Sequence, residues 1–338
     1  MKLIKTTEAV GQVLCHDMTQ IIPGEYKGAR FRKGHIVTEE DIPVLLSMGK
    51  ENLYIFETDE NTLHENDAAE ILCKICKGEN ITRSEVSEGK IELYADIDGL
   101  FTIVREKLNA VNSVDEIMIA TRKGDTAVKK GDKLAGTRVI PLVIGRDRMD
   151  QAQTAAGDTP ILSVLPYILK TAAIITTGSE VFYGRIEDKF TPVIIEKLGK
   201  FGIEVAEHIV TDDDINNVEN AINSVRGKVD MIICTGGMSV DPDDNTPGAI
   251  KNTGADIVTY GAPVLPGAMF LLGYYEDGTP VMGLPGCVMY AKATIFDLVL
   301  PRIAAGVKLT KADFVEYGEG GLCLGCKPCT YPHCPFGR

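Results

Sequence analysis

Residues 170–306 alternate between short apolar runs and amphipathic segments, the pattern of strands that alternate with helices. The apolar runs AAIIT and MIICT are typical of strands buried on both faces. Strands and helices are expected in turn at residues 171–178, 189–202, 204–210, 214–227, 229–237, 245–254 and 288–306. This alternation predicts an α/β fold, with a three-layer, mostly parallel sheet covered by helices.

Smaller mixed α+β segments are expected before this domain. Residues 1–57 combine strand-like pieces with an amphipathic helix at 38–49, for which Thr38 is the expected N-cap. Residues 58–148 combine helical patterns at 65–78 and 100–113 with strand patterns. The sequence then predicts a linker at 149–169, the α/β domain at 170–306 and a cysteine-rich tail at 307–338.

The charge balance is acidic, with 48 Asp and Glu residues against 35 Lys and Arg residues and a net charge of -13. Such a balance argues against binding to nucleic acid or to an anionic membrane, and it favours a small-molecule or protein partner. The start of the chain lacks the apolar core of a secretory signal, and Pro166 and Lys170 interrupt the most apolar stretch. We therefore expect a cytoplasmic protein.

Glycine and hydroxyl residues follow three of the expected strands. Ligands of parallel sheets bind beyond the carboxyl ends of the strands, where backbone N–H groups converge on anions and neighbouring carboxylates suit a divalent cation. Each loop alone could be a tight turn, and the acidic residues could be helix caps. The candidate site comprises Thr177, Gly178, Ser179, Glu180, Asp188, Gly236, Gly237, Met238, Ser239, Asp243, Asp244, Thr246, Pro247, Pro285 and Gly286.

Three motifs in these loops resemble one family. TTGSEV with GRIED, VDMIICTGGMSV with DDNTP, and GLPGCVMYAKATIFDLVLP are similar to the molybdopterin-binding domain of molybdenum insertases, molybdopterin adenylyltransferases and competence-damage-inducible proteins. The resemblance covers about two-fifths of the chain. It implies that Gly236, Gly237 and Ser239 bind the terminal phosphate of a pterin. It also implies that Thr177, Gly178, Ser179 and Met238 belong to the cofactor site.

The same resemblance assigns the remaining positions. It implies that Asp244, Thr246 and Pro247 match a metal-associated acidic loop, that Glu180 and Asp188 match acidic positions around the first loop, and that Pro285 and Gly286 match a Pro-Gly turn. Asp243 joins Asp188 and Asp244 as an expected Mg²⁺ ligand. The pieces VGQVLCHDM and FRKGHIVTEEDIPVLLSMGKENLYIF look like parts of an insertase N-terminal domain. Insertases carry a proline-rich, aromatic stretch between these pieces, and IIPGEYKGA in this chain does not match it.

The sequence departs from the insertases at three places. Ser179 stands where they commonly carry aspartate, Cys287 where they carry asparagine, and VLPGAM at residues 264–269 where a pair of lysines flanks Pro-Gly. Fixed positive charge would replace the hydration of molybdate, and neither Leu265 nor Ala268 supplies it. The scaffold of a pterin site is thus expected without the usual oxyanion site.

Two functions follow from this combination. In the first, the chain is a divergent molybdopterin molybdotransferase, in which Asp244 and Glu180 hold Mg²⁺ on a phosphate of molybdopterin or its adenylate. In the second, it is a non-catalytic carrier or sensing factor that delivers the cofactor to a molybdoenzyme. A nucleotide pyrophosphatase is a third hypothesis. The expected partners are a pterin phosphate, a molybdoenzyme and further copies of the chain in a homo-oligomer.

Four of the nine cysteines lie in the last sixteen residues, as Cys323-x2-Cys326-x2-Cys329-x4-Cys334-Pro335. Clustered thiols in a reducing compartment indicate metal more often than disulfides. The run resembles bacterial ferredoxin spacing, which favours a [4Fe–4S] cluster over Zn²⁺. The alternative is a reduced, unliganded tail or a thiol-based interaction site.

Overall fold

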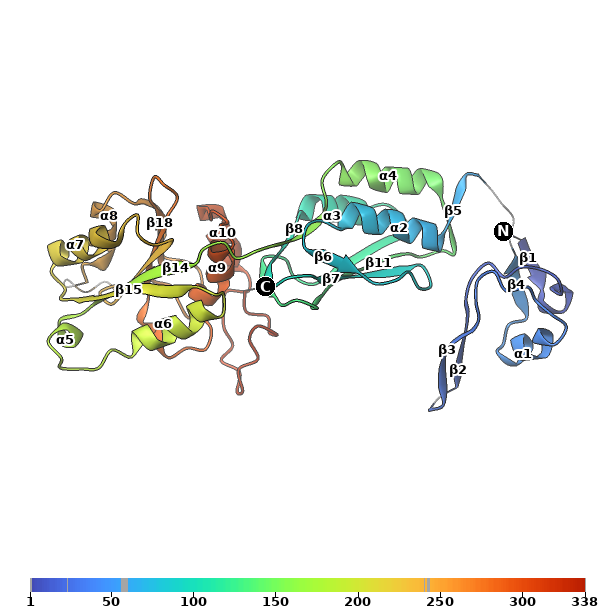
Figure 1. Ribbon diagram of the computed structural model, residues 1–338, viewed down its shortest axis with the longest axis horizontal. Helices are drawn as coiled ribbons and strands as arrows, with labels where there is room; N and C mark the ends of the chain where they lie inside the picture. Colours follow the sequence, from blue (N-terminus) through green and yellow to red (C-terminus); the bar gives the residue numbers. More distant parts are fainter. Residues whose placement is uncertain (1, 23, 56–59, 240, 242–243, 338) are drawn as a thin grey trace. The chain divides into compact units, whose positions relative to one another are not determined.

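The computed structural model describes residues 2–22, 24–55, 60–239, 241 and 244–337. The chain forms two compact units, shown in Figure 1. The first comprises Met1–Asp96, Ile103–Arg122 and Lys130–Val164, and the second comprises Ile97–Thr102, Lys123–Lys129 and Leu165–Arg338. Among the described residues, no helix has the length and apolar character needed to span a bilayer.

The amino-terminal part of the first unit is a small mixed structure around its own core. Strand β1 (Lys2–Lys5) pairs antiparallel with β4 (Asn52–Ile55), β2 (Met18–Ile22) pairs with β3 (Tyr26–Phe31), and a short 3-10 helix, η1 (Thr6–Glu8), follows β1. Helix α1 (Asp41–Ser47) begins three residues after Thr38, which is therefore not its N-cap. The Asp41 carboxylate instead accepts hydrogen bonds from the N–H and hydroxyl of Thr38 at 2.8 and 2.9 Å.

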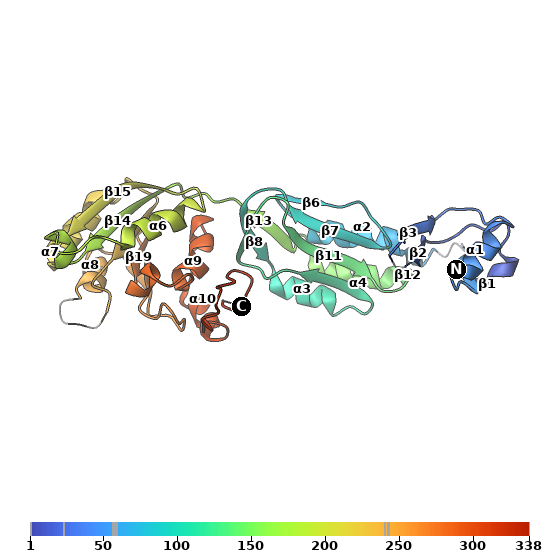
Figure 2. The same cartoon turned by 90° about the horizontal axis from the view of Figure 1, so that it is seen from below.

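The rest of the first unit is an antiparallel sheet with helices on one face (Figure 2). The strand order is β6 (Ile81–Arg83), β7 (Lys90–Ala95), β11 (Lys133–Val139), β9 (Ile117–Thr121). The covering helices are α2 (Glu65–Cys76), α3 (Arg105–Asn112) and α4 (Arg146–Ala156). Strands β5 (Thr62–His64) and β12 (Val143–Gly145) pair beside them, and β13 (Leu162–Leu165) follows α4.

Two segments of the chain before residue 170 differ from the expected elements. Residues 149–156 were predicted to begin a linker but lie in α4, where Met149, Ala152 and Ala156 are fully buried along one face. Residues 100–103 were predicted to begin a helix but form strand β8 (Gly99–Ile103), which pairs antiparallel with β10 (Thr126–Val128). Leu100 and Phe101 are adjacent and both fully buried, so this strand does not show the alternation of apolar and polar residues by which strands are predicted.

The second unit is built on a six-stranded sheet with the order β15-β14-β16-β19-β18-β17. The first four strands run parallel, and β18 and β17 add an antiparallel extension. The strands are β14 (Thr171–Thr177), β15 (Glu204–Thr211), β16 (Met231–Thr235), β17 (Asp256–Tyr260), β18 (Leu271–Tyr274) and β19 (Pro280–Leu284).

Helices cover both faces of this sheet, which confirms the predicted three-layer α/β fold (Figure 1). One core includes residues of α6 (Phe190–Gly199) and α9 (Ile295–Ala304), together with Ile174 and Ile233 of the sheet. The other includes residues of α7 (Ile215–Val225) and α8 (Thr246–Asn252). Short helices α5 (Ser179–Phe182), α10 (Lys311–Val315) and η3 (Glu316–Gly318) complete the unit.

The last long helix is shorter than expected. Residues 288–306 were predicted to be one helix, but a 3-10 turn, η2 (Gly286–Met289), precedes a break, and α9 begins only at Ile295. Thr294 caps α9 by accepting from the N–H of Phe296 at 3.2 Å, while Asp297 accepts from the N–H of Thr294 at 2.8 Å. This capping box fixes the helix start at a position that apolar periodicity does not mark.

Candidate functional site

The predicted loops meet at one edge of the sheet because the strands that precede them end in register. Thr177 of β14 pairs with Thr211 of β15, and Thr176 pairs with Thr235 of β16. Thr235 in turn pairs with Leu284 of β19. The parallel strands therefore deliver their following loops to the same carboxyl edge, where α/β proteins bind ligands.

The loop after β16 has a backbone that requires glycine. Gly236 and Gly237 adopt φ values of +85° and +52°, in the left-handed region. A Cβ on Gly236 would lie 2.1 Å from the carbonyl oxygen of Thr177, and a Cβ on Gly237 would lie 2.9 Å from the Thr246 hydroxyl oxygen. The loop thus passes tightly over the end of β14 and the start of α8.

This tight path leaves backbone donors available. The N–H groups of Gly237, Met238 and Ser239 donate no hydrogen bond to any residue within the described ranges. The hydroxyls of Thr177 and Thr246 lie 3.1 Å apart beside Gly237. Consecutive N–H groups that donate to no described residue, next to hydroxyls, suit an anion such as a phosphate.

Side chains fix the far end of the same loop. Met238 is only 4% exposed and packs in the core of the α7 and α8 face, so its backbone rather than its side chain is available at the surface. The hydroxyl of Tyr260 donates to the carbonyl oxygen of Met238 at 3.1 Å. Burial, and then the charge of Asp244, raise the pKa of Tyr260, which therefore stays protonated as the donor. Ser239 is exposed and is positioned to meet a ligand.

Asp213 joins two of the loops, a role that the sequence did not reveal. Its carboxylate accepts a hydrogen bond of 2.7 Å from the N–H of Ser179, and its carbonyl oxygen accepts one of 3.0 Å from the side chain of Asn245. The next residue, Asp214, caps α7. The contact could have been predicted only from the pairing of Thr177 with Thr211, because this pairing brings the residues after both strands together.

The Asp188 carboxylate already accepts several hydrogen bonds from residues at the start of α6. Its carboxylate accepts from the N–H groups of Phe190 and Thr191 at 2.8 and 3.1 Å and from the hydroxyl of Thr191 at 2.6 Å. Burial raises the pKa of Asp188, but these bonds and the nearby His208 outweigh it and lower the pKa overall. Asp188 therefore starts α6 and offers few lone pairs to a metal ion.

Asp244 and Glu180 are not gathered into a metal site with other described residues. Asp244 is half-buried at the end of its loop, Glu180 is exposed in α5, and Asp243 lies outside the described residues. No three His, Cys, Asp or Glu side chains are arranged to hold a metal ion in the part of the chain that the structure describes. Mg²⁺ binding at Asp244 and Glu180 stays a prediction.

The remaining candidates line the same edge. Thr246 and Pro247 begin α8, with Thr246 only 1% exposed, and Gly178 precedes α5 with φ +142°. Pro285 is buried at the end of β19, whereas Gly286 is exposed and has no atom near the position of a Cβ. Burial raises the pKa of the neighbouring Cys287 thiol, so this side chain brings no negative charge at neutral pH.

Substitution of Gly236 should show that the loop geometry is required. We expect Gly236→Ala to reduce the free energy of unfolding of the second unit by about 1–3 kcal/mol more than Gly254→Ala. Gly254 has a matching φ of +87° but no atom within 4 Å of a Cβ, so the difference isolates the clash with Thr177. Denaturant unfolding of both variants measures it, and equal losses would contradict the tight approach.

Comparison with known proteins agrees with this geometry. Residues 173–305 match the family described as a probable molybdopterin binding domain, and residues 3–57 match a domain of unknown function (DUF8806). A CinA-like protein of Pseudothermotoga lettingae is 40% identical over 85 residues, which are 25% of this chain and 21% of that protein. The match thus spans about a fifth of the length of that curated relative.

Solved structures give partial matches. The molybdopterin biosynthesis enzyme MoaB of Thermus thermophilus is 20% identical, with a TM-score of 0.34, over 43% of this chain and 98% of that chain. The molybdopterin biosynthesis MoeA protein of Pyrococcus horikoshii is 15% identical, with a TM-score of 0.35, over 72% of this chain and 80% of that chain. By the family match and the three loop motifs, residues 173–305 are similar to the molybdopterin-binding domains of the superfamily that includes the competence-damage-inducible proteins.

Proposed function

We propose that the loops after β14, β16 and β19 bind the terminal phosphate of molybdopterin or of its adenylate, and that the protein acts in molybdenum cofactor biosynthesis. The observation that carries this proposal is the loop at 236–239. Its glycine backbone, its N–H groups without an acceptor among the described residues, and the adjacent hydroxyls of Thr177 and Thr246 suit a phosphate. The described cysteines are all free thiols, which supports a reducing, cytoplasmic setting for this role.

Identification of the small molecule that co-purifies with the protein tests the ligand class. The full chain should be purified without air from cells that make the cofactor, and the released small molecules analysed by mass spectrometry. We expect a pterin that carries a phosphate or an adenylate. Calorimetry with molybdopterin should then show saturable binding by the ligand-free protein. A preparation that contains no pterin and that binds none in the calorimeter would contradict the proposal.

We favour a role in holding and delivering the pterin to a molybdoenzyme over a role in molybdate transfer. A transferred oxyanion needs fixed positive charge, and the segment at 264–269 supplies none. Instead this segment pairs with the tail: the N–H of Leu265 donates to the carbonyl of Gly321 at 2.8 Å, and the N–H of Cys323 donates to the carbonyl of Leu265 at 2.7 Å.

Turnover separates the two roles. In molybdate transfer, Asp244 and Glu180 would hold Mg²⁺ beside the adenylate phosphate and neutralise its charge. The holding role predicts no release of AMP when the protein is incubated with adenylated molybdopterin, Mg²⁺ and molybdate. It further predicts that Asp244→Asn leaves the affinity for molybdopterin unchanged. Release of AMP that disappears in Asp244→Asn would establish the transferase instead.

A further inference from the structure

The cysteine-rich tail is fixed at both of its ends on the second unit. At its start, the N–H of Cys323 bonds to Leu265, as described above. At its end, Phe336 is only 4% exposed within the core of the α6 and α9 face, and the N–H of Gly337 donates to the carbonyl of Gly320 at 2.9 Å. The loop between these points is therefore closed, although it contains no helix or strand.

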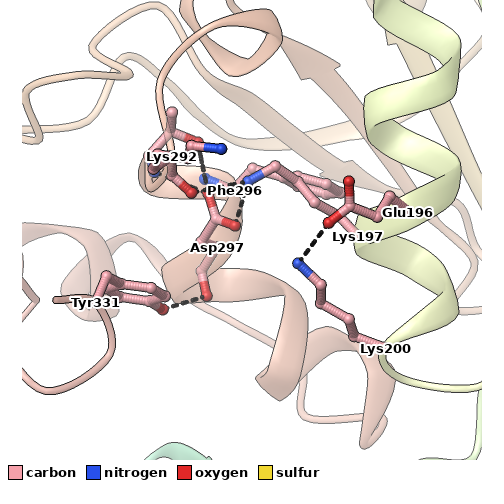
Figure 3. A network of polar contacts seen from close by, with 8 residues as sticks. Glu196, Lys197, Lys200, Lys292, Phe296, Asp297 and Tyr331 are labelled. Atoms are coloured by element: carbon pink, nitrogen blue, oxygen red, sulfur yellow. Dashed lines mark hydrogen bonds and ion pairs between the residues drawn. The ribbon is translucent and has the colours of Figure 1, made fainter. Parts of the chain in front are cut away.

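A third attachment lies between the last two cysteines. The hydroxyl of Tyr331 donates to the carbonyl oxygen of Asp297 in α9 at 3.0 Å (Figure 3). Figure 3 also shows the ion pair between Asp297 and Lys197 of α6. The residue that binds the tail is therefore itself fixed to α6. Tyr331 is thus anchored midway between Cys329 and Cys334.

This closed loop brings all four cysteines around one cavity. Cys323 and Cys334 are half-buried and pack against the core, whereas Cys326 and Cys329 are exposed. By contrast, Cys15, Cys73, Cys76 and Cys234 are buried. The cavity is lined by Ala293, Cys323, Leu324, Cys326, Cys329, Thr330, Tyr331, Cys334, Pro335 and Phe336.

We propose that Cys323, Cys326, Cys329 and Cys334 bind a [4Fe–4S] cluster in this cavity. Each thiol loses a proton and its sulfur bonds one iron. The sulfurs do not yet surround a common point, since no three metal-ligating side chains do so within the described residues. Cluster binding therefore requires the exposed Cys326 and Cys329 to turn towards Cys323 and Cys334, which pack against the core.

The spacing and the surroundings favour this cluster over zinc. Two residues separate each of the first three cysteines from the next, as in bacterial ferredoxins, whereas zinc ribbons use two separate C-x2-C turns. Ala293, on the connection from the Pro285-Gly286 turn to α9, also lines the cavity. The cluster would therefore lie against the segment that connects the third loop of the pterin site to α9. The cluster proposal does not depend on pterin binding.

Metal analysis of the full chain tests the cluster. Protein purified without air, or reconstituted with Fe²⁺ and sulfide, should be brown and contain about four irons and about four sulfides per chain. Cys326→Ala and Cys329→Ala should lose this iron, because each removes a ligand from an exposed position and leaves the core intact. Lys327→Ala, in the same loop, is the matched control and should keep it.

Three outcomes would overturn the proposal: colourless protein with one zinc per chain, protein that binds neither metal after reconstitution, or full iron content in both cysteine variants. The anchor is tested separately with Tyr331→Phe, which removes only the hydroxyl that bonds to Asp297. This variant should bind the cluster but lose iron to a chelator several-fold faster than the wild type. An unchanged rate would show that the attachment at Tyr331 does not hold the cluster site.

Discussion

Ser239→Asp should weaken the binding of molybdopterin by roughly fivefold to 1,000-fold. The new carboxylate would stand about 4 Å from the ligand's phosphate, where two like charges repel by roughly 1 kcal/mol in water and roughly 4 kcal/mol near a protein surface. Ser239 is exposed, so the substitution needs no rearrangement of the core. Calorimetry with molybdopterin measures the loss, and raised salt should reduce it, because salt screens repulsion between exposed charges.

Ser239→Asn is the matched control, since it has nearly the shape of aspartate without the charge. Its affinity should stay within a few-fold of the wild-type value. Gly237→Asp is the less useful variant, because its Cβ would also press on the Thr246 hydroxyl. If Ser239→Asp and Ser239→Asn bind molybdopterin equally well, the phosphate lies elsewhere and the assignment of this loop is wrong.

The second large effect is on stability. Lys197→Met should reduce the free energy of unfolding by about 3–5 kcal/mol, the usual loss when one partner of a buried ion pair is removed. The side chains of Lys197 and Asp297 are only 9% and 14% exposed, and their charged groups are in direct contact (Figure 3). Without the lysine, Asp297 keeps its bonds to Thr294 but remains a buried charge without a cation.

A second ion pair, at the C-terminal end of the same helix, provides the control. Glu196 and Lys200 also form an ion pair, but their side chains are 74% and 60% exposed. Lys200→Met should therefore change the stability little, because exposed pairs are solvated and screened. Chemical unfolding of both variants, with the double variant Lys197→Met/Asp297→Asn, measures the coupling. A loss in Lys197→Met no larger than in Lys200→Met would contradict the importance of this contact between α6 and α9.

The sequence predicted strands β14, β15 and β16 and the loops at the carboxyl edge of the sheet, because both are local features. Apolar runs such as AAIIT mark buried strands, and glycines mark the turns after them. Strands β17 and β18 were not predicted. Asp277-Gly278, between β18 and β19, was an available hairpin signal.

The polar contacts that tie the site together could not be predicted in the same way. Ser179 and Asp213 are 34 positions apart, and the hydroxyl of Tyr260 reaches back 22 positions to Met238. Such pairs depend on the register between strands, which composition and periodicity leave open. Met149 and Ala152 show the opposite case: their spacing of three residues was a helical signal, but the polar residues around them suggested a linker.

The two outer strands of the sheet in the second unit, β15 and β17, have a consequence for self-association. Each has a neighbouring strand on one side only, and such edges can recruit strands from other molecules. Exposed acidic side chains stand along both, at Glu204 and Glu207 of β15 and at Asp256 of β17. In a chain with a net charge of -13, these edges repel one another. The sheet should therefore resist continuation from copy to copy into fibrils.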